Sequence, residues 1–417
     1  MNTYVLEVLL WLGIFIVFYA YLGYGLVLSV LIQIKRLIKG RPNIPDLSDE
    51  DLPEVTFVVA AYNEEDWIEE KVANCLEFDY PRNKIQLLFV TDGSDDRTPE
   101  LIRNYSCPTD AQLVLHHQNA RRGKIAAVER IMDYIETPIT IYTDANTLVN
   151  PQAIRKIVRH YADPRVGAVA GEKRIAMSKA DSANAAGEGI YWKYESTLKR
   201  WDSEFHTVVG AAGELFSIRT DLYQPVPQDS IIEDFFMTMR IAGSGYRVRY
   251  EPESYAVESS SASVKEELKR KIRIAAGGLQ SIFRLLPLLN VFKYGWLSFQ
   301  YVSHRALRWT LAPLALPLVL LTNLLLVWWT GSSFYSYLLM AQLAFYGAAL
   351  IGWILEKQKI KFKAFFVPYY FCVMNYAVYR GFGRYLKGSQ SVIWERAKRA
   401  ESVSEEKSLA ESSSVEK

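Results

Sequence analysis

Cysteine and histidine are scarce in this chain of 417 residues. The three cysteines, Cys75, Cys107 and Cys372, lie far apart without a CxxC pair, and the five histidines show no metal-ligand spacing. These absences argue against a disulfide framework and a cysteine-based zinc site, and they favour a reducing location that faces the cytosol. The chain also lacks a strong net charge: it has 48 basic and 46 acidic residues, or +2. We therefore expect no nucleic-acid partner.

Charge is also absent from a long stretch near the N-terminus, residues 8–34. A bilayer span takes about 20 apolar residues, whereas the apolar part of a signal peptide is shorter and follows its basic residues. Here the basic residues Lys35, Arg36, Lys39 and Arg41 come afterwards. The positive-inside rule then places the N-terminus outside and the following residues in the cytoplasm.

A second uncharged stretch covers residues 309–355 and is interrupted by polar and small residues at 330–333. This pattern predicts two membrane spans joined by a tight turn. Four lysines follow between residues 357 and 363, which favours a cytoplasmic loop. The two spans would then leave the cytoplasm and return to it.

The next uncharged stretch, residues 364–379, is shorter and contains Pro368 and Asn375. It predicts either a fourth span or a re-entrant segment, and the basic residues of the tail favour the second. Residues 279–304 mix apolar and basic side chains, which is typical of a helix that lies in the membrane interface. The last residues are rich in Ser, Glu and Lys, and we expect part of this tail to be disordered.

Between the apolar regions, residues 52–275 alternate strand-like and helix-like patterns. The predicted strands are 55–60, 85–90, 113–116 and 139–142, and the predicted helices are 64–76, 123–135 and two that begin at Thr98-Pro99 and Asn150-Pro151. Such alternation predicts a mostly parallel sheet that is covered on both faces. Ligands of these sheets bind beyond the carboxyl ends of the strands.

The residues that follow three of these strands are polar and acidic, at 61–65, 91–96 and 143–146. Carboxylates at one sheet edge repel one another unless a cation lies among them. Mg²⁺ or Mn²⁺ with a phosphate ligand suits such a site, because these ions prefer carboxylate, amide and phosphate oxygens. The GxGxxG pattern of a dinucleotide fold is absent after the first strand.

Over residues 53–280 the chain resembles the family-2 glycosyltransferases, which include cellulose and hyaluronan synthases. The resemblance implies a GT-A-like (Rossmann-like) α/β domain flanked by transmembrane helices. It also implies that Ala61, Tyr62 and Glu64 form a first nucleotide-sugar loop, with Asp92 in a second loop on the base or ribose. On the residues alone, Asp92-Gly93 also fits an ordinary turn, and Glu64 fits an acidic helix start.

Two further motifs match the family's contacts to the diphosphate. Lys124 at a helix start matches a lysine near the diphosphate, although a solvated basic turn is the plain alternative. Asp144-Ala145-Asn146 occupies the place of the DxD motif, so Asp144 and Asn146 would hold the metal. Asn146 replaces the second aspartate, supplies no charge, and leaves more of the site to Asp144. A capped strand end is the other interpretation.

Glu233-Asp234 matches the family's Glu-Asp motif, whose aspartate is the catalytic base. Ser230 and Glu233 also fit a helix capping box, which explains Glu233 but not Asp234. Arg273 matches the arginine of the QxxRW motif, where it would neutralise the departing diphosphate. Contact of this basic cluster with anionic lipid is its alternative interpretation.

Arg270 replaces the Gln of QxxRW and Ile274 replaces its Trp, which puts polymer synthesis in doubt. Residues 210–213 resemble the small-residue acceptor loop and serve as support only. Trp394-Glu395-Arg396 in the tail reads as an interfacial anchor.

We therefore predict five regions. They are an N-terminal transmembrane helix (1–41), a cytoplasmic GT-A glycosyltransferase domain (42–278), interfacial helices (279–308), C-terminal transmembrane or re-entrant helices (309–386) and a polar cytoplasmic tail (387–417).

The expected activity is inverting, metal-dependent hexosyl transfer from a nucleotide-diphosphate sugar, with a UDP-sugar favoured, to a membrane-proximal or lipid-linked glycan. The expected location is a bacterial inner or plasma membrane. Two alternatives stay open, a processive polysaccharide synthase and a non-catalytic membrane subunit of a synthase complex. A homo-oligomer is compatible with either.

Overall fold

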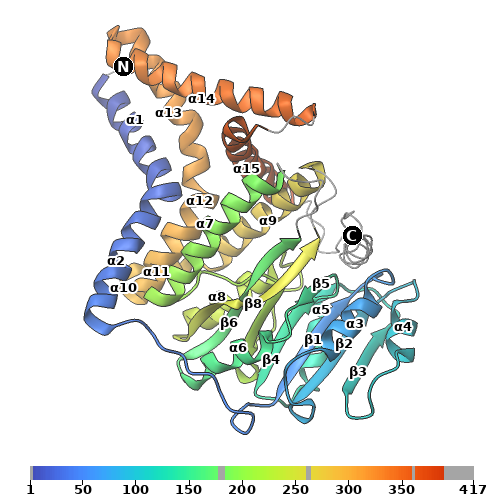
Figure 1. Ribbon diagram of the computed structural model, residues 1–417. Helices are drawn as coiled ribbons and strands as arrows, with labels where there is room; N and C mark the ends of the chain where they lie inside the picture. Colours follow the sequence, from blue (N-terminus) through green and yellow to red (C-terminus); the bar gives the residue numbers. More distant parts are fainter. Residues whose placement is uncertain (1–2, 177–183, 260–263, 359–361, 389–417) are drawn as a thin grey trace, which may run out of the picture. The chain divides into compact units, whose positions relative to one another are not determined.

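The computed structural model describes residues 3–176, 184–259, 264–358 and 362–388. These residues form two compact units, which we describe separately (Figure 1). One unit contains the described residues of Lys39–Ser178 and Lys199–Ser263, and the other contains those of Met1–Ile38, Lys179–Leu198 and Val264–Gln390. We call them the sheet unit and the helical unit.

The sheet unit is built on one mixed sheet. Its strands are β1 (Val55–Ala61), β2 (Ile85–Asp92), β3 (Gln112–Gln118), β4 (Ile139–Asp144), β5 (Thr147–Val149), β6 (Val166–Ala176), β7 (Leu215–Arg219) and β8 (Arg247–Ser259). Their order across the sheet is β3-β2-β1-β4-β7-β6-β8-β5. Neighbours are parallel from β3 through β4 and again between β6 and β8, while β7 is antiparallel to both its neighbours.

The central strands are parallel because helices cross over between them, and burial of both faces explains their continuous apolar sequences. In β1, six of the seven residues are buried. Register pairs Ala60 of β1 with Asp144 of β4, and Ala61 with Thr91 of β2. The polar residues that follow these three strands therefore reach the same edge of the sheet. The predicted α/β class and mostly parallel sheet are confirmed.

The helices of this unit are α3 (Ile68–Leu76), α4 (Thr98–Asn104), α5 (Lys124–Met132), α6 (Ala153–Val158) and α8 (Glu233–Gly243). α3 and α6 begin later than the sequence predicts, whereas α4 begins one residue earlier. Residues 64–67 precede α3 as a turn. Thr98 is the first residue of α4 and not its cap, because its hydroxyl accepts the Glu64 N–H at 2.8 Å. Asn150 opens no helix, because its amide bonds the backbone of Glu253 and Tyr255.

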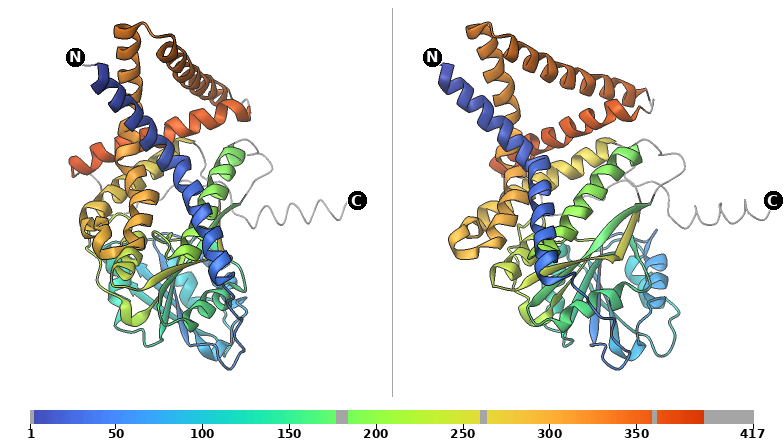
Figure 2. Two further views of the ribbon diagram at one scale, coloured as in Figure 1. Left: turned by 90° about the vertical axis from the view of Figure 1, so that its left-hand side faces the viewer. Right: turned by 60° about the vertical axis from the view of Figure 1, so that its left-hand side comes forward.

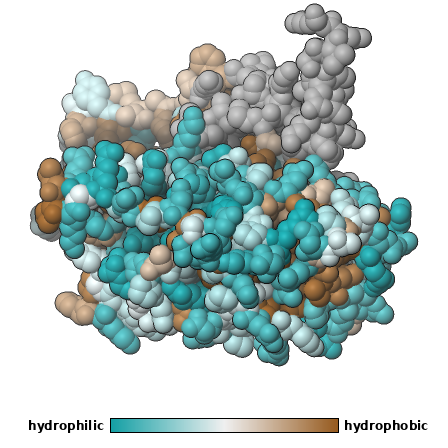
Figure 3. All heavy atoms as spheres, turned by 60° about the horizontal axis from the view of Figure 1, so that its bottom comes forward, coloured by the Kyte–Doolittle hydropathy of each residue, from teal (hydrophilic) through white to brown (hydrophobic). Residues whose placement is uncertain are grey.

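Hydrophilic side chains dominate the face shown in Figure 3, with scattered apolar residues between them. The large exposed apolar side chains belong mainly to helices of the other unit, such as Leu26, Trp328 and Tyr337. This distribution is expected if water surrounds the sheet unit and lipid surrounds the apolar helices.

The helical unit contains three helices that are long and apolar enough to cross a membrane: Thr3–Lys39, Leu311–Thr330 and Ser333–Lys357. The first consists of α1 (Thr3–Phe18), a π-helical turn η1 (Tyr19–Gly23) and α2 (Tyr24–Lys39), and the others are α13 and α14. A left-handed Gly331 (φ 60°) separates α13 from α14, as the interrupted apolar stretch predicted. α1 packs against α13 through Leu6, Leu10, Val319 and Leu326.

The fourth apolar stretch forms one continuous helix, α15 (Lys363–Leu386), which packs beside α14 (Figure 2). It is not among the three candidate spans, and its path stays a prediction. Residues 279–308 do not form a single helix. They comprise the end of α9 (Val264–Arg284), η5 (Leu286–Leu289), α10 (Val291–Tyr294), α11 (Trp296–Tyr301), η6 (Val302–Ala306) and α12 (Leu307–Trp309). Pro287 and the left-handed Gly295 break the continuity. The tail motif at residues 394–396 lies outside the described residues.

A buried charge cluster ties the helical unit together. Glu195, on α7 (Asn184–Phe205), contacts His304, Arg305 at 2.5 Å and Arg308 at 3.2 Å. Arg308 also donates to the Ala20 carbonyl at 2.9 Å, and Tyr194 donates to the Tyr21 carbonyl at 2.7 Å. Both carbonyls belong to η1, and a π-helical turn exposes carbonyls that an α-helix would bond internally. The cluster thus supplies hydrogen-bond donors to the backbone carbonyls of η1.

We predict that Glu195→Ala strongly destabilises the purified protein, by about 3–5 kcal/mol, because removal of one partner leaves buried charge uncompensated. The midpoint of thermal unfolding in detergent measures this effect. Glu266→Ala, which removes a carboxylate from the more exposed Lys269 pair, is the control and should change stability by less than about 1 kcal/mol. Equal midpoints for both variants would contradict the role assigned to Glu195.

Candidate active site

The loops that follow β1 and β2 are bonded to each other. The Asn63 amide donates to Asp95 at 2.5 Å and accepts the Asp95 N–H at 3.1 Å. The Glu64 N–H donates to the Thr98 hydroxyl, and the Glu65 N–H donates to Asp96 at 3.1 Å. Asn63 adopts a left-handed conformation (φ 52°), which asparagine tolerates better than most residues. The two predicted nucleotide loops therefore form one polar rim at the sheet edge.

Asp92 connects this rim to the start of α5. Its Oδ2 accepts the N–H groups of Arg122 at 2.7 Å and Gly123 at 2.6 Å. Its Oδ1 is buried without a hydrogen bond from the described residues and lies 3.5 Å from Arg130 Nη1. Gly93 has φ 68°, and a Cβ there would lie 2.7 Å from the backbone of Arg121, so only glycine fits. Asp92 thus fixes the loop that presents Lys124, and one of its oxygens stays available to a ligand donor.

Lys124 joins two of the predicted carboxylates. Its Nζ lies 2.8 Å from Asp144 Oδ1 and 3.0 Å from Glu233 Oε1. Asp144 ends β4, Lys124 begins α5 and Glu233 begins α8, so three separate elements meet at this ammonium. The structure therefore brings together the predicted diphosphate, metal and Glu-Asp motifs.

The Glu-Asp motif stands at the first turn of α8. The cap residue is Ile232 and makes no side-chain cap hydrogen bond, so Ser230 does not occupy the cap position that the alternative capping box assigns to it. Gly213 lies beside this turn: a Cβ on it would be 3.5 Å from Asp234 Oδ2 and 3.6 Å from Lys124 Nζ. Gly210 (φ 83°) packs so closely that a Cβ would lie 2.1 Å from the Phe235 ring. The small-residue loop therefore lines the space beside Asp234.

The electrostatics of this cluster follow from burial and crowded carboxylates. Burial, reinforced by Glu233, raises the pKa of Asp234 to about 7. Burial also raises the pKa of Asp144, partly offset by Lys124. Burial alone would lower the pKa of Lys124, but Asp144 and Glu233 outweigh it and raise that pKa. The site thus contains a carboxylate near its midpoint at neutral pH and an ammonium that stays charged.

Glu214 also belongs to this cluster, although no motif in the sequence marks it and only its place after the small-residue loop could have pointed to it. Its charge raises the pKa of both Asp144 and Asp234, behind the effect of burial. Its own carboxylate pairs with the buried Lys173 of β6, which also pairs with Glu258 of β8. Glu214 therefore adds negative potential to the site.

These residues fit a divalent cation. Three carboxylates, Asp144, Glu233 and Asp234, surround a single ammonium, so the cluster carries excess negative charge. The described residues contain no group of three or more His, Cys, Asp or Glu side chains able to cage a metal alone. Mg²⁺ is commonly held by one or two carboxylates together with substrate phosphates. Asp144 and Asn146 are the residues that would hold the ion.

The other predicted residues have separate places. Tyr62 lies on the rim, with the Arg121 guanidinium 3.7 Å from its ring centroid. Ala61 ends β1. Arg273 lies on α9 in the helical unit, and its role stays a prediction from the resemblance. Arg270 pairs with Glu267 of the same helix at 3.1 Å.

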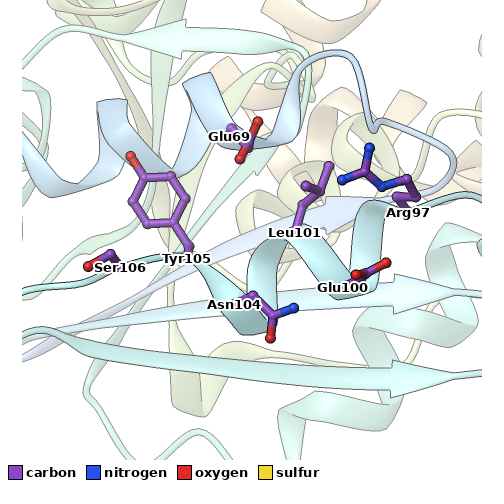
Figure 4. Close-up of a pocket in the computed structure, with 7 residues that line it drawn as sticks. All are labelled: Glu69, Arg97, Glu100, Leu101, Asn104, Tyr105 and Ser106. Atoms are coloured by element: carbon purple, nitrogen blue, oxygen red, sulfur yellow. The ribbon is translucent and has the colours of Figure 1, made fainter.

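A pocket elsewhere in the sheet unit contains none of the predicted residues (Figure 4). Its lining comes from α3, α4 and the segments that flank α4: Glu69, Arg97, Glu100, Leu101, Asn104, Tyr105 and Ser106.

The chain is similar to known glycosyltransferases. The chain is 27% identical over 248 residues to the poly-β-1,6-N-acetyl-D-glucosamine synthase of Staphylococcus aureus (strain MSSA476), and the match covers 58% of this chain and 58% of that protein. It is similar in structure to the mannosyltransferase PcManGT from Pyrobaculum calidifontis in complex with GDP-Man and Mn²⁺. That match has a TM-score of 0.68 at 24% identity and covers 92% of this chain and 100% of the other.

The profile of the family described as glycosyl transferase family group 2 matches residues 139–355, more than half of the chain. This region contains Asp144, Glu214, Glu233 and Asp234. The chain belongs to glycosyl transferase family group 2 and is a glycosyltransferase with a GT-A-like fold.

Proposed function

We propose that the chain transfers a sugar from a nucleotide-diphosphate donor to the hydroxyl of a membrane-proximal or lipid-linked glycan, with inversion at the anomeric carbon. The observation that carries this proposal is the cluster in which Lys124 bridges Asp144 and Glu233 beside Asp234. A general base works best when its pKa lies near the operating pH, and the raised pKa of Asp234 meets this requirement.

The chain's own residues would act as follows. Asp234 accepts the proton of the acceptor hydroxyl while that oxygen bonds to the anomeric carbon. The bond from this carbon to the diphosphate oxygen breaks at the same time, on the opposite face of the sugar. Lys124 has an ammonium at a helix start, where it can contact a phosphate oxygen of the leaving group. A divalent cation on Asp144 and Asn146 would neutralise the charge that develops on the diphosphate.

Asp92 and Tyr62 are the proposed contacts of the nucleoside. Asp92 Oδ1 is a buried acceptor that a ribose hydroxyl or base N–H can satisfy. We favour a UDP-sugar donor, and GDP-sugars belong in any test because the Pyrobaculum mannosyltransferase binds GDP-Man. The three apolar helices support a multi-pass membrane protein whose sheet unit is cytoplasmic.

A processive polysaccharide synthase is the second candidate. The staphylococcal relative, named as a polymer synthase, favours it. Ile274 in place of the motif's Trp favours single transfer. Product length with purified enzyme and lipid extract separates the two.

Nucleotide release by the detergent-purified protein tests the proposal. A panel of UDP-, GDP- and dTDP-sugars is supplied with Mn²⁺ or Mg²⁺, with and without membrane lipid extract. We expect metal-dependent release from one donor class and a loss of about 10²–10⁴-fold in Asp234→Asn, because the amide cannot accept the proton. If Asp234→Asn still releases nucleotide at the wild-type rate, Asp234 is not the general base. Donor binding without release in the wild type would favour a non-catalytic subunit.

Asp234→Asn should be more stable than the wild type at pH 8. The pKa of Asp234 rises from 3.8 to about 7 in the folded state, so stability is lost as pH rises towards 7 and the buried carboxylate ionises. Asp234→Asn removes this cost and should raise the unfolding midpoint by about 2–4 °C. A lower midpoint would show that its loss of activity comes from misfolding.

The pH dependence of the rate should reflect the same carboxylate. Asp234 accepts a proton only when ionised, so kcat/KM for the donor should fall tenfold per pH unit below about 7. A bound cation favours the ionised form, so the fall in kcat should occur at lower pH. Profiles from pH 5.5 to 9 measure both limbs. A donor kcat/KM that is flat from pH 6 to 8 would contradict this assignment.

Asn146→Asp should tighten metal binding. The substitution supplies a second charged ligand beside Asp144, and affinity for hard cations rises with the charge of the ligand set. We expect the Mn²⁺ concentration for half-maximal activity to fall by about tenfold, which corresponds to about 1.4 kcal/mol. Asn104→Asp, on α4 and outside the cluster, controls for added charge. A half-maximal Mn²⁺ concentration that stays the same or rises would place the ion away from Asn146.

A further inference from the structure

Lys71 of α3 is a buried lysine that the proposed mechanism does not use. Its side chain has no exposed surface, although a lysine in a protein interior is costly. The ammonium donates to the Thr147 carbonyl at 2.7 Å and to the Thr143 hydroxyl at 3.2 Å. Burial lowers the pKa of Lys71 to about 8, which leaves the side chain mostly charged at neutral pH. A cation retained at this cost needs an explanation.

The two threonines that Lys71 contacts flank the Asp144-Ala145-Asn146 turn. Thr143 is the last residue before the turn, and Thr147 is the first residue after it. The Thr147 hydroxyl donates to the Asp144 carbonyl at 2.9 Å, across the turn. The Thr143 hydroxyl donates to the Glu214 carbonyl at 2.8 Å. The network therefore fixes the turn at both ends and also holds the backbone of Glu214.

The ammonium anchors one end of this network. It can only donate, so the Thr143 oxygen accepts from it, while the Thr143 hydroxyl donates to the Glu214 carbonyl and lies 3.1 Å from the Thr147 hydroxyl. At the other end, the bond from Lys71 to the Thr147 carbonyl holds the residue whose hydroxyl closes the turn. An apolar side chain of the same length would fill the space and lose both bonds.

A neighbouring side chain shows what simple attachment of α3 looks like. Asn74, one turn later, donates to the Val149 carbonyl at 2.8 Å and accepts the Val149 N–H at 2.8 Å. This pair attaches α3 to β5 and contacts neither Asp144 nor Asn146. Substitution of Lys71 therefore tests the bonds that hold the turn, and substitution of Asn74 tests the bonds that attach α3 to the sheet.

We propose that Lys71 is a positioning residue that holds the Asp144-Ala145-Asn146 turn in the geometry that binds a divalent cation and the donor diphosphate. This inference rests on the proposed function, because it assumes that the turn holds the ion. Residues that orient metal ligands typically contribute about 10–100-fold to metal affinity.

The test measures binding directly. Full-length protein in detergent is titrated with Mn²⁺ at fixed UDP or GDP, and bound Mn²⁺ is followed by electron paramagnetic resonance. We expect Lys71→Met to weaken Mn²⁺ binding by about 10–100-fold. Thr147→Val, which removes the hydroxyl bonds to the Asp144 carbonyl and to Thr143, should weaken it as well, whereas Thr147→Ser should bind like the wild type. Asn74→Ala should lower the unfolding midpoint and leave Mn²⁺ affinity unchanged.

The outcomes separate this inference from the proposed function. If the wild-type protein binds no Mn²⁺ with either UDP or GDP, both this inference and the proposed function are overturned. If the wild type binds Mn²⁺ and the folded Lys71→Met and Thr147→Val variants bind it with the same affinity, the role of Lys71 is overturned and the proposed function stands. Asn74→Ala that weakens Mn²⁺ binding as much as Lys71→Met also overturns it, since support of α3 would then be sufficient. If Lys71→Met does not fold, the Mn²⁺ affinities of Thr147→Val and Thr147→Ser decide. Weaker binding by Thr147→Val supports the inference, and equal binding by the two variants overturns it.

Discussion

The contacts of one ammonium organise the candidate site. Lys124 holds Asp144 at 2.8 Å and Glu233 at 3.0 Å, and without it these carboxylates would repel each other at the edge of the sheet. Its position depends in turn on Asp92, which binds the two N–H groups just before α5. Each charged residue of the site is therefore held by another part of the same edge. The single ammonium leaves net negative charge, which a metal–diphosphate complex can use.

The sheet topology explains why these residues meet. Parallel pairing of β1 with β2 and β4 sends three polar loops to one edge. β7 then enters antiparallel beside β4 and begins at that edge, so that Glu214, just before β7, lies among the acidic residues. The start of α8 brings Glu233 and Asp234 to the same place. Lys124 and Asp234, which are 110 positions apart in the sequence, thus lie in one cluster.

The sequence predicted the strands and their common polar edge well and the helix boundaries less well. Strands β1, β2 and β4 lie where their apolar runs indicated, because burial of both faces imposes such runs. A helix does begin at Thr98-Pro99, but α3 and α6 begin later than predicted at Ile68 and Ala153. Glu214 carries no motif, so only the fold reveals it. Lys71 did leave a signal: it lies on the buried helix face with Ile68 and Val72, where a lysine is unexpected.

The two buried charge clusters show different uses of the same interaction. In the helical unit, Glu195 offsets His304, Arg305 and Arg308, and the arginine and tyrosine beside it bond the open carbonyls of η1. That cluster joins three segments of the unit, and its arginines and carboxylate pair with one another and with backbone carbonyls. In the sheet unit the carboxylates exceed the ammonium and the pKa of Asp234 rises accordingly. Such an imbalance costs stability, and excess carboxylate charge at the sheet edge suits a divalent cation.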